Sequence, residues 1–307
     1  MAHIRSNPNI DAECRSLLQK AVRRSDAKVA RSATIRLLEN NETIWLRNRL
    51  GVIAFEECWH NTERLSFNLN PSSLILQYED LAESKKNKNA AGLGSLAYEL
   101  SLGATTTLLK NDENNRHLKI ICEAIKRPND FWPWINALEK TEQQKKTTHL
   151  AEHGFKLAGW PWDKAFAVST AYLSVTENIP NYTSIKDKNP QPFPYWVAID
   201  KHTPEGKKAL ASCGKQLKID KETLGWIQFY FESASCYQLD DCYWWDREKT
   251  WRFGNLGLSM DEADQIWKEA SILIKDFLEP QQTKLIERLL MSEQRYTMTI
   301  NTQEKLI

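Results

Sequence analysis

The chain has 307 residues, of which 41% are hydrophobic and 26% are charged, a balance typical of a globular protein with a substantial core. Its formal net charge is +1, so binding to a nucleic acid would depend on a local basic surface. No apolar run approaches the roughly 20 residues that span a bilayer, and residues 1–9 lack the apolar core of a signal peptide. We therefore expect a cytoplasmic protein that makes no membrane contact.

The cysteines and histidines give no sign of a disulfide framework or a metal site. The six cysteines form no Cys-x-x-Cys pair, and a chain of this length does not need disulfides for stability, so we expect reduced thiols. His149 and His153 alone have a spacing compatible with a shared metal, and a solvated helix face explains this pair more simply. Neither a metal nor a cofactor is predicted.

Residues 12–60 predict three helices joined by short turns at Ser25-Asp26 and Asn40-Asn41. Apolar residues recur at the helical period, and they are Leu17, Leu18, Ala21, Val22, Val29, Ala30, Ala33 and Leu37. The same stretch is rich in arginine, at positions Arg15, Arg23, Arg24, Arg31, Arg36, Arg47 and Arg49. These arginines either contact phosphates or are simply solvated, and the sequence leaves both interpretations open.

A short pattern in this N-terminal block resembles a known helical region. The pattern comprises Lys20-Ala21-Val22-Arg23, Trp45-Leu46, Arg49-Leu50 and Val52-Ile53-Ala54 with Glu56. It is similar to the helical C-terminal region of the RarA/MgsA family of replication-associated ATPases. The chain has no Gly-x-x-x-x-Gly-Lys-Ser/Thr loop, so nucleotide hydrolysis does not follow from the likeness. The resemblance implies a helical packing module.

Amphipathic helices continue through residues 71–130, and Phe131-Trp132-Pro133-Trp134 indicates a junction. We therefore predict an N-terminal helical lobe over residues 1–130 and a second helical lobe over residues 131–307. The second lobe carries the residues that suggest chemistry.

Residues 157–210 predict two helix starts joined by an extended connector. Gly159 and Pro161 indicate a turn before a helix that carries Lys164 in its first turn. Prolines at 190, 192 and 194 keep the connector extended. Thr203 is a favourable N-cap followed by Pro204 at the first helical position, so Asp200 lies just before a helix.

This arrangement resembles the helix-hairpin-helix DNA glycosylases, particularly the archaeal 8-oxoguanine glycosylase branch. Residues 198–202, Ala-Ile-Asp-Lys-His, match the apolar-Asp-x-His motif of that superfamily, and Leu157-Ala158-Gly159-Trp160-Pro161 replaces its usual Leu-Pro-Gly-x-Gly hairpin. The resemblance implies an all-α, two-lobed fold with a DNA-binding cleft, in which Asp200 and Lys164 are catalytic and Gly159 contacts DNA.

The implied chemistry needs both groups. Cleavage of an N-glycosidic bond develops positive charge on the sugar, which the Asp200 carboxylate would stabilise. A neutral Lys164 amine close to Asp200 would form a Schiff base with the opened sugar and give lyase activity. The competing interpretation is a surface lysine at 164 and a helix-capping carboxylate at 200.

An enzyme that flips a base needs aromatic surfaces around it and cations for the backbone. Tryptophan is abundant, with 12 residues. The candidates for the base pocket are Trp160, Trp162, Phe193, Tyr195, Trp196 and His202. The candidates for DNA contact are Lys201, Thr203, Lys207 and Lys208, beside a predicted helix N-terminus. The stretch from Asp240 to Glu248 is acidic, and we expect DNA to avoid it.

The sequence therefore predicts a monomeric DNA N-glycosylase that removes a modified base from double-stranded DNA, in repair or in defence against phages. We expect the polar connector over residues 178–184 to form a wall of the base pocket. The alternative is a non-enzymatic helical module that binds replication DNA or a protein partner. The sequence does not identify the base.

Overall fold

The computed structural model describes residues 11–66, 69–104, 115–177, 184–185 and 191–304. Across these residues the protein is all-α: the chain forms helices, and β-pairing is limited to isolated bridges such as that between Cys58 and Asn87. This confirms the predicted fold class. None of the helices in the described ranges combines the length and the apolar character that crossing a membrane requires.

The N-terminal helices are α1 (Ala12–Arg23), α2 (Ala27–Glu39), α3 (Thr43–Glu57), the 3-10 helix η1 (Trp59–Arg64) and α4 (Pro71–Glu83). Asp11 and Asp26 cap α1 and α2 by accepting hydrogen bonds from backbone N–H groups. Ser25 and Asn41 adopt positive φ angles of 61° and 63°, which lets each predicted turn reverse the chain sharply. The apolar faces of α1, α2 and α4 share one core cluster.

The second group comprises α5 (Asn89–Ser101), α7 (Asn115–Lys126), α8 (Pro128–Ala137), α9 (Glu142–Leu157) and α10 (Pro161–Thr176). Helix α10 packs against both α5 and α9. A Cβ atom at Gly94 would lie 2.9 Å from the backbone of Ala165, so glycine allows α5 and α10 to approach closely. One apolar cluster contains Leu93 and Leu118 together with Ala151 and Leu173, and it therefore extends across position 130.

The third group comprises η2 (Tyr195–Ala198), α11 (Pro204–Leu217), α12 (Lys221–Gln228), the π-helical segment Phe229–Ser233, α13 (Tyr243–Asn255), α14 (Met260–Leu278), η4 (Glu279–Gln281) and α15 (Gln282–Glu304). Helix α13 returns to pack on α5, where a Cβ atom at Gly92 would lie 2.3 Å from the backbone of Trp244. Helix α15 packs along α2.

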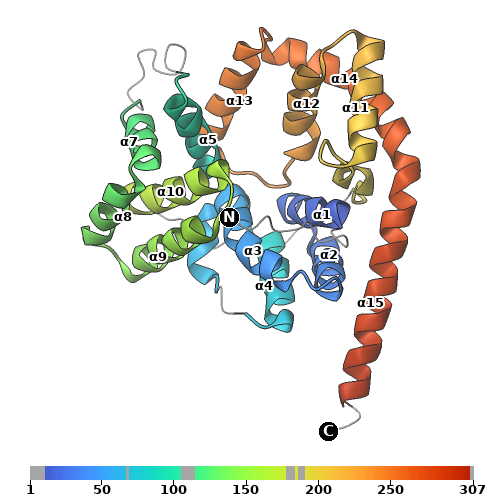
Figure 1. The fold of residues 1–307 in the computed structure, drawn as a ribbon, viewed down its shortest axis with the longest axis horizontal. Helices are drawn as coiled ribbons and strands as arrows, with labels where there is room; N and C mark the ends of the chain where they lie inside the picture. Colours follow the sequence, from blue (N-terminus) through green and yellow to red (C-terminus); the bar gives the residue numbers. More distant parts are fainter. Residues whose placement is uncertain (1–10, 67–68, 105–114, 178–183, 186–190, 305–307) are drawn as a thin grey trace, which may run out of the picture.

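Figure 1 shows how these groups are arranged. Helices α7 to α10, in green, gather on one side, and α11, α12, α14 and α15, in yellow to red, lie on the other. Helices α1 to α3, in blue, lie between them. Helices from before and after residue 130 pack against each other, with α5 and α10 in direct contact.

Candidate functional site

A cavity of about 1230 Å³ opens where the three groups of helices meet. Seven aromatic rings line it, from Trp45, Trp160, Trp162, Phe166, Trp226, Phe229 and Trp245. Ionisable side chains line it as well, from Arg15, Lys20, Arg23, Arg49, Glu56, Asp163, Asp200, Lys201, His202 and Glu248. The cavity can therefore offer both stacking surfaces and charged hydrogen-bonding groups to a ligand.

Asp200 lies between η2 and α11, as the sequence predicted. Thr203 caps α11 by accepting a hydrogen bond of 3.0 Å from Gly206 N–H, and its own hydroxyl donates to the Asp200 carbonyl at 2.9 Å. The Asp200 Oδ1 atom accepts the backbone N–H of His202 at 2.9 Å. The backbone that carries Asp200 packs directly on Gly206, where a Cβ atom would lie only 1.9 Å from the Asp200 carbonyl oxygen. These contacts hold the carboxylate at the cavity wall.

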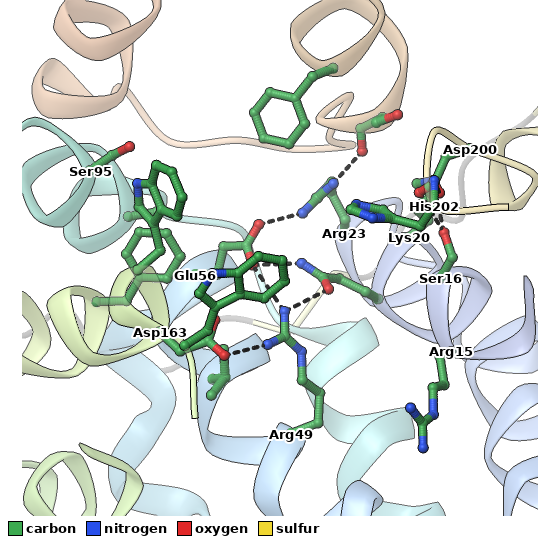
Figure 2. Close-up of a pocket in the computed structure, with 18 of the residues that line it drawn as sticks. Arg15, Ser16, Lys20, Arg23, Arg49, Glu56, Ser95, Asp163, Asp200 and His202 are labelled. Carbon is green, nitrogen blue, oxygen red and sulfur yellow. Dashed lines mark hydrogen bonds and ion pairs between the residues drawn. The ribbon is translucent and has the colours of Figure 1, made fainter. Parts of the chain in front are cut away.

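The cation that pairs with Asp200 comes from α1. Lys20 is buried, with 3% of its surface exposed, and its Nζ atom lies 2.6 Å from Asp200 Oδ2. The same nitrogen donates to Val197 O at 2.5 Å and to Ser16 Oγ at 2.9 Å. The Ser16 hydroxyl in turn donates to Asp200 Oδ2 at 2.9 Å. Ser16, Lys20 and Asp200 thus form one connected group at the cavity wall (Figure 2).

Burial and ion pairing shift the pKa values of Asp200 and Lys20 in opposite directions. Burial alone would raise the pKa of Asp200, but the Lys20 ammonium and the His202 N–H stabilise the carboxylate and lower that pKa to about 2. Burial lowers the pKa of Lys20, and the attraction of Asp200 opposes this effect. Asp200 is therefore ionised at neutral pH, and Lys20 is an amine whose proton is held less firmly than in water.

Another part of the cavity lining carries a chain of hydrogen bonds centred on Arg49 (Figure 2). The Arg49 guanidinium contacts Asp163 Oδ2 at 2.9 Å and the Gln19 side-chain oxygen at 3.0 Å. The Gln19 amide donates to Glu56 at 2.5 Å, and Glu56 also accepts from Arg23 at 2.5 Å. This chain joins α1 and α3 to the first turn of α10, and it aligns several polar groups along one side of the cavity.

A third wall contains a buried carboxyl group. Glu248 on α13 is 2% exposed; Tyr230 donates a short hydrogen bond to it, and Ser95 donates at 3.4 Å. Burial raises the pKa of Glu248, which the nearby Arg252 partly offsets. Tyr230 lies in the π-helical segment between α12 and α13, a backbone feature frequent at functional sites.

The structure places Lys164 away from Asp200. As predicted, Lys164 is in the first turn of α10. Its ammonium, however, lies over the Phe155 ring, 5.2 Å from the ring centre, and the residues that line the cavity include Asp163 but not Lys164. The helical period is the physical reason, because adjacent residues project about 100° apart. Lys20 occupies the position beside Asp200 that the sequence interpretation gave to Lys164.

The predicted aromatic residues divide into two sets. Trp160, which is 58% exposed, and Trp162 line the cavity, as does His202. Phe193, Tyr195 and Trp196 instead pack with the apolar core clusters. The short helix η2 directs Trp196 inward, and its backbone N–H is bonded to Gln282 at the start of α15. Of the predicted polar wall at 178–184, residues 178–183 lie outside the described residues.

The predicted DNA-contact residues lie around the start of α11. Lys201, Lys207 and Lys208 are exposed, and the Lys201 ammonium lies 5.1 Å from the centre of the Trp226 ring. Thr203 is buried and serves as the helix cap. Gly159 is exposed and lines the cavity. This end of α11 therefore presents cations beside the cavity.

The arginines of the N-terminal helices are engaged within the molecule. Each has a carboxylate or carbonyl partner: Arg15 with Glu42, Arg23 with Glu56 and Glu57, Arg24 with Glu232, Arg31 with Glu79, Arg36 with Asp11, Arg47 with Leu69, and Arg49 with Asp163. Simple solvation, one of the two interpretations of the sequence, does not describe them. Their pairing also reduces the charge that they can offer to phosphates.

Several residues that line the cavity were not predicted from the sequence, including Lys20, Gln19, Arg49 and Asp163. A signal was present for Lys20, because a lysine three residues after Leu17 and next to Ala21 lies within the apolar face of α1. The other three carried no such signal, since polar residues of their kind are common on helices. Their convergence depends on how α1, α3 and α10 pack.

Among the described residues, no three His, Cys, Asp or Glu side chains converge so as to hold a metal ion. No family model matches the chain, and no curated protein or solved structure is significantly similar to it.

Proposed function

We propose that this protein is a cytoplasmic DNA N-glycosylase that removes a modified base flipped into the cavity. One observation carries the proposal: the Asp200 carboxylate, whose pKa is held at about 2, lies at the wall of a cavity lined by aromatic rings. An ionised carboxylate beside a stacking pocket is the combination that N-glycosidic cleavage requires.

The charge of Asp200 suits the transition state. As the bond between the base and C1′ breaks, positive charge develops on the sugar ring, and a fixed carboxylate stabilises that charge more than it stabilises the neutral substrate. The contacts from Lys20 and the His202 N–H fix the carboxylate before the substrate arrives. Little reorganisation is then needed during the reaction.

The cavity suits an extrahelical base. Its volume of about 1230 Å³ exceeds the range of roughly 300–1000 Å³ that is common for small-molecule sites. Trp160 lines the cavity with 58% of its surface exposed and offers a ring face on which a base can stack, and the Arg49, Gln19 and Asp163 groups offer donors and acceptors for its edge. A normal base must be refused, so selectivity would come from contacts to groups that only a modified base has.

The start of α11 suits the DNA backbone. Lys207 and Lys208 are exposed on its first turns, and its N-terminal N–H groups carry partial positive charge. A phosphate held here would lie on the same backbone segment as Asp200. Such an enzyme would act in repair or in defence against phages.

The direct test is release of a base and formation of an abasic site. Purified protein would be incubated with duplexes that contain 8-oxoguanine, with phage DNA that carries hypermodified pyrimidines, and with unmodified DNA. We expect abasic sites in at least one modified DNA and none in the unmodified control. If the protein binds DNA but releases no base from any of these substrates, the enzyme proposal is contradicted. A non-enzymatic DNA-binding module would then be the better description.

A further inference from the structure

We propose that Lys20, and not Lys164, supplies the amine that bonds to C1′ of the sugar. This inference rests on the proposed glycosylase function and names a catalytic residue for it. Lys20 lies on α1, at the opposite end of the sequence from the motif that resembles the glycosylases. The N-terminal helices would therefore contribute directly to the chemistry.

The position of the amine is the first argument. Lys20 lines the cavity, and its Nζ atom lies 2.6 Å from the carboxylate that would stabilise the sugar cation. A nucleophile must be placed beside the carbon where that charge develops. Lys164 is held over Phe155 instead, outside the cavity lining.

The environment of the amine is the second argument. Lys20 is 3% exposed, and burial favours the neutral amine, which is the nucleophilic form. The ammonium has three partners, Val197 O, Asp200 Oδ2 and Ser16 Oγ. When it loses a proton, two N–H bonds remain for Val197 and Asp200.

The bond changes balance without an additional reactant. The departing base takes the electron pair of the broken N-glycosidic bond, and the Lys20 ammonium gives it a proton. The neutral amine donates its lone pair to C1′. A proton then passes from nitrogen to O4′ as the C1′–O4′ bond breaks, and the nitrogen lone pair forms a protonated imine. Solvent water then accepts a proton from C2′, the electrons of that C–H bond form the C2′–C3′ double bond, and the phosphate leaves with the electron pair of the broken C3′–O bond.

A duplex with a preformed abasic site tests Lys20 independently of the identity of the base. There the amine forms the same imine with the C1′ aldehyde, and water leaves. Sodium borohydride delivers hydride to the imine carbon and fixes the adduct as a secondary amine. Proteolysis and mass spectrometry of the full-length wild-type protein then locate the modified residue. We expect the adduct on Lys20; an adduct on Lys164 or on the N-terminal amine, or no adduct, would overturn the proposal.

Two matched variants add a second measurement. Lys20→Arg keeps a cation for Asp200 but lacks a nucleophilic amine, and we expect the adduct yield to fall by at least about tenfold because arginine stays protonated. Lys164→Arg should keep the wild-type yield. Thermal unfolding of each variant checks that it is folded, and the peptide map of the wild-type protein decides the question if Lys20→Arg does not fold.

The two proposals can fail separately. An adduct on Lys20 with no base released from any modified DNA would support the Lys20 assignment and contradict the glycosylase function. Base release without an adduct on Lys20 would support the glycosylase function and overturn the assignment.

Discussion

Lys20 and Asp200 are 180 residues apart in the sequence, yet Lys20 Nζ lies 2.6 Å from Asp200 Oδ2. The pair joins α1 to the segment between η2 and α11. Because neither side chain is fully solvated, removal of one leaves the other as a buried charge without its partner. The candidate site is therefore a property of the whole chain, and residues 131–307 alone would lack its cation.

Replacement of Asp200 by Asn tests the charge at the site. Asparagine retains the size of the side chain but removes the negative charge that the sugar cation needs. We expect base release to fall by about 100- to 1000-fold, the usual loss when one preorganised electrostatic group is removed. DNA affinity, measured by fluorescence anisotropy, should change little because the cations around α11 remain. Full base release by Asp200→Asn would exclude this carboxylate from the reaction.

The acid stability of the protein should also depend on Asp200. Its pKa is lowered from 3.8 to about 2 in the folded protein, so its ionised form stabilises the fold above pH 4 and loses that effect as the pH falls toward 2. The free energy of unfolding of the wild-type protein should exceed that of Asp200→Asn at pH 5, and this difference should shrink by about 2 kcal/mol by pH 2. Urea unfolding at several pH values measures it. A difference independent of pH would contradict the pairing.

The fold class and several local features were predictable from the sequence. Helical periodicity indicated α1 and α2, and turn residues indicated the reversals at Ser25 and Asn41. Thr203 and Pro204 indicated the start of α11. These features depend on residues close together in the chain, where propensity and capping act directly. The interleaving of α5 with α10 and α13 was not predictable, because the sequence does not state which apolar faces meet.

The candidate site was predictable only in part, for the same reason. Asp200, Trp160 and Trp162 were chosen from the sequence and line the cavity. The partner of Asp200 was assigned to Lys164 from a resemblance of local motifs, whereas the actual contact is with Lys20. A motif gives the order of residues along the chain. The distance between two helices is determined by packing of the core.

The exposed lysines of α11 give a prediction for DNA binding. Lys207 and Lys208 are both exposed, so both charges are available to phosphates. The double variant Lys207→Ala/Lys208→Ala should bind DNA more weakly, and the slope of log affinity against log salt should fall by about one for each lysine.

The control for this prediction is Lys119→Ala/Lys146→Ala. These two lysines are exposed on α7 and α9, across the molecule from α11 in Figure 1. The control should keep the affinity and the salt dependence of the wild-type protein. Equal losses in both double variants would indicate a general charge effect and would remove the reason for placing DNA at α11.

Gly206 should be required for the position of Asp200. A Cβ atom at residue 206 would lie 1.9 Å from the Asp200 carbonyl oxygen and 2.8 Å from that of Ile199. Backbone atoms cannot rotate away as a flexible side chain can, so Gly206→Ala must shift the segment that carries Asp200. A displacement of about 1 Å at a catalytic group can lower the rate by about 100-fold, and we expect a loss of that order in base release. Overpacking should also cost about 1–3 kcal/mol of stability.

Gly254→Ala is the matched control, because Gly254 lies in α13 and a Cβ atom there would meet no atom within 4 Å. Alanine has the higher helix propensity, so this variant should be as stable as the wild-type protein or more stable by up to about 1 kcal/mol. Thermal unfolding and base release would be measured for both variants. The loss of stability and the loss of activity in Gly206→Ala can be separated at a temperature where the variant is fully folded. A large loss of base release at that temperature would show that the position of Asp200 matters. Wild-type base release would show that the close contact with α11 is not needed.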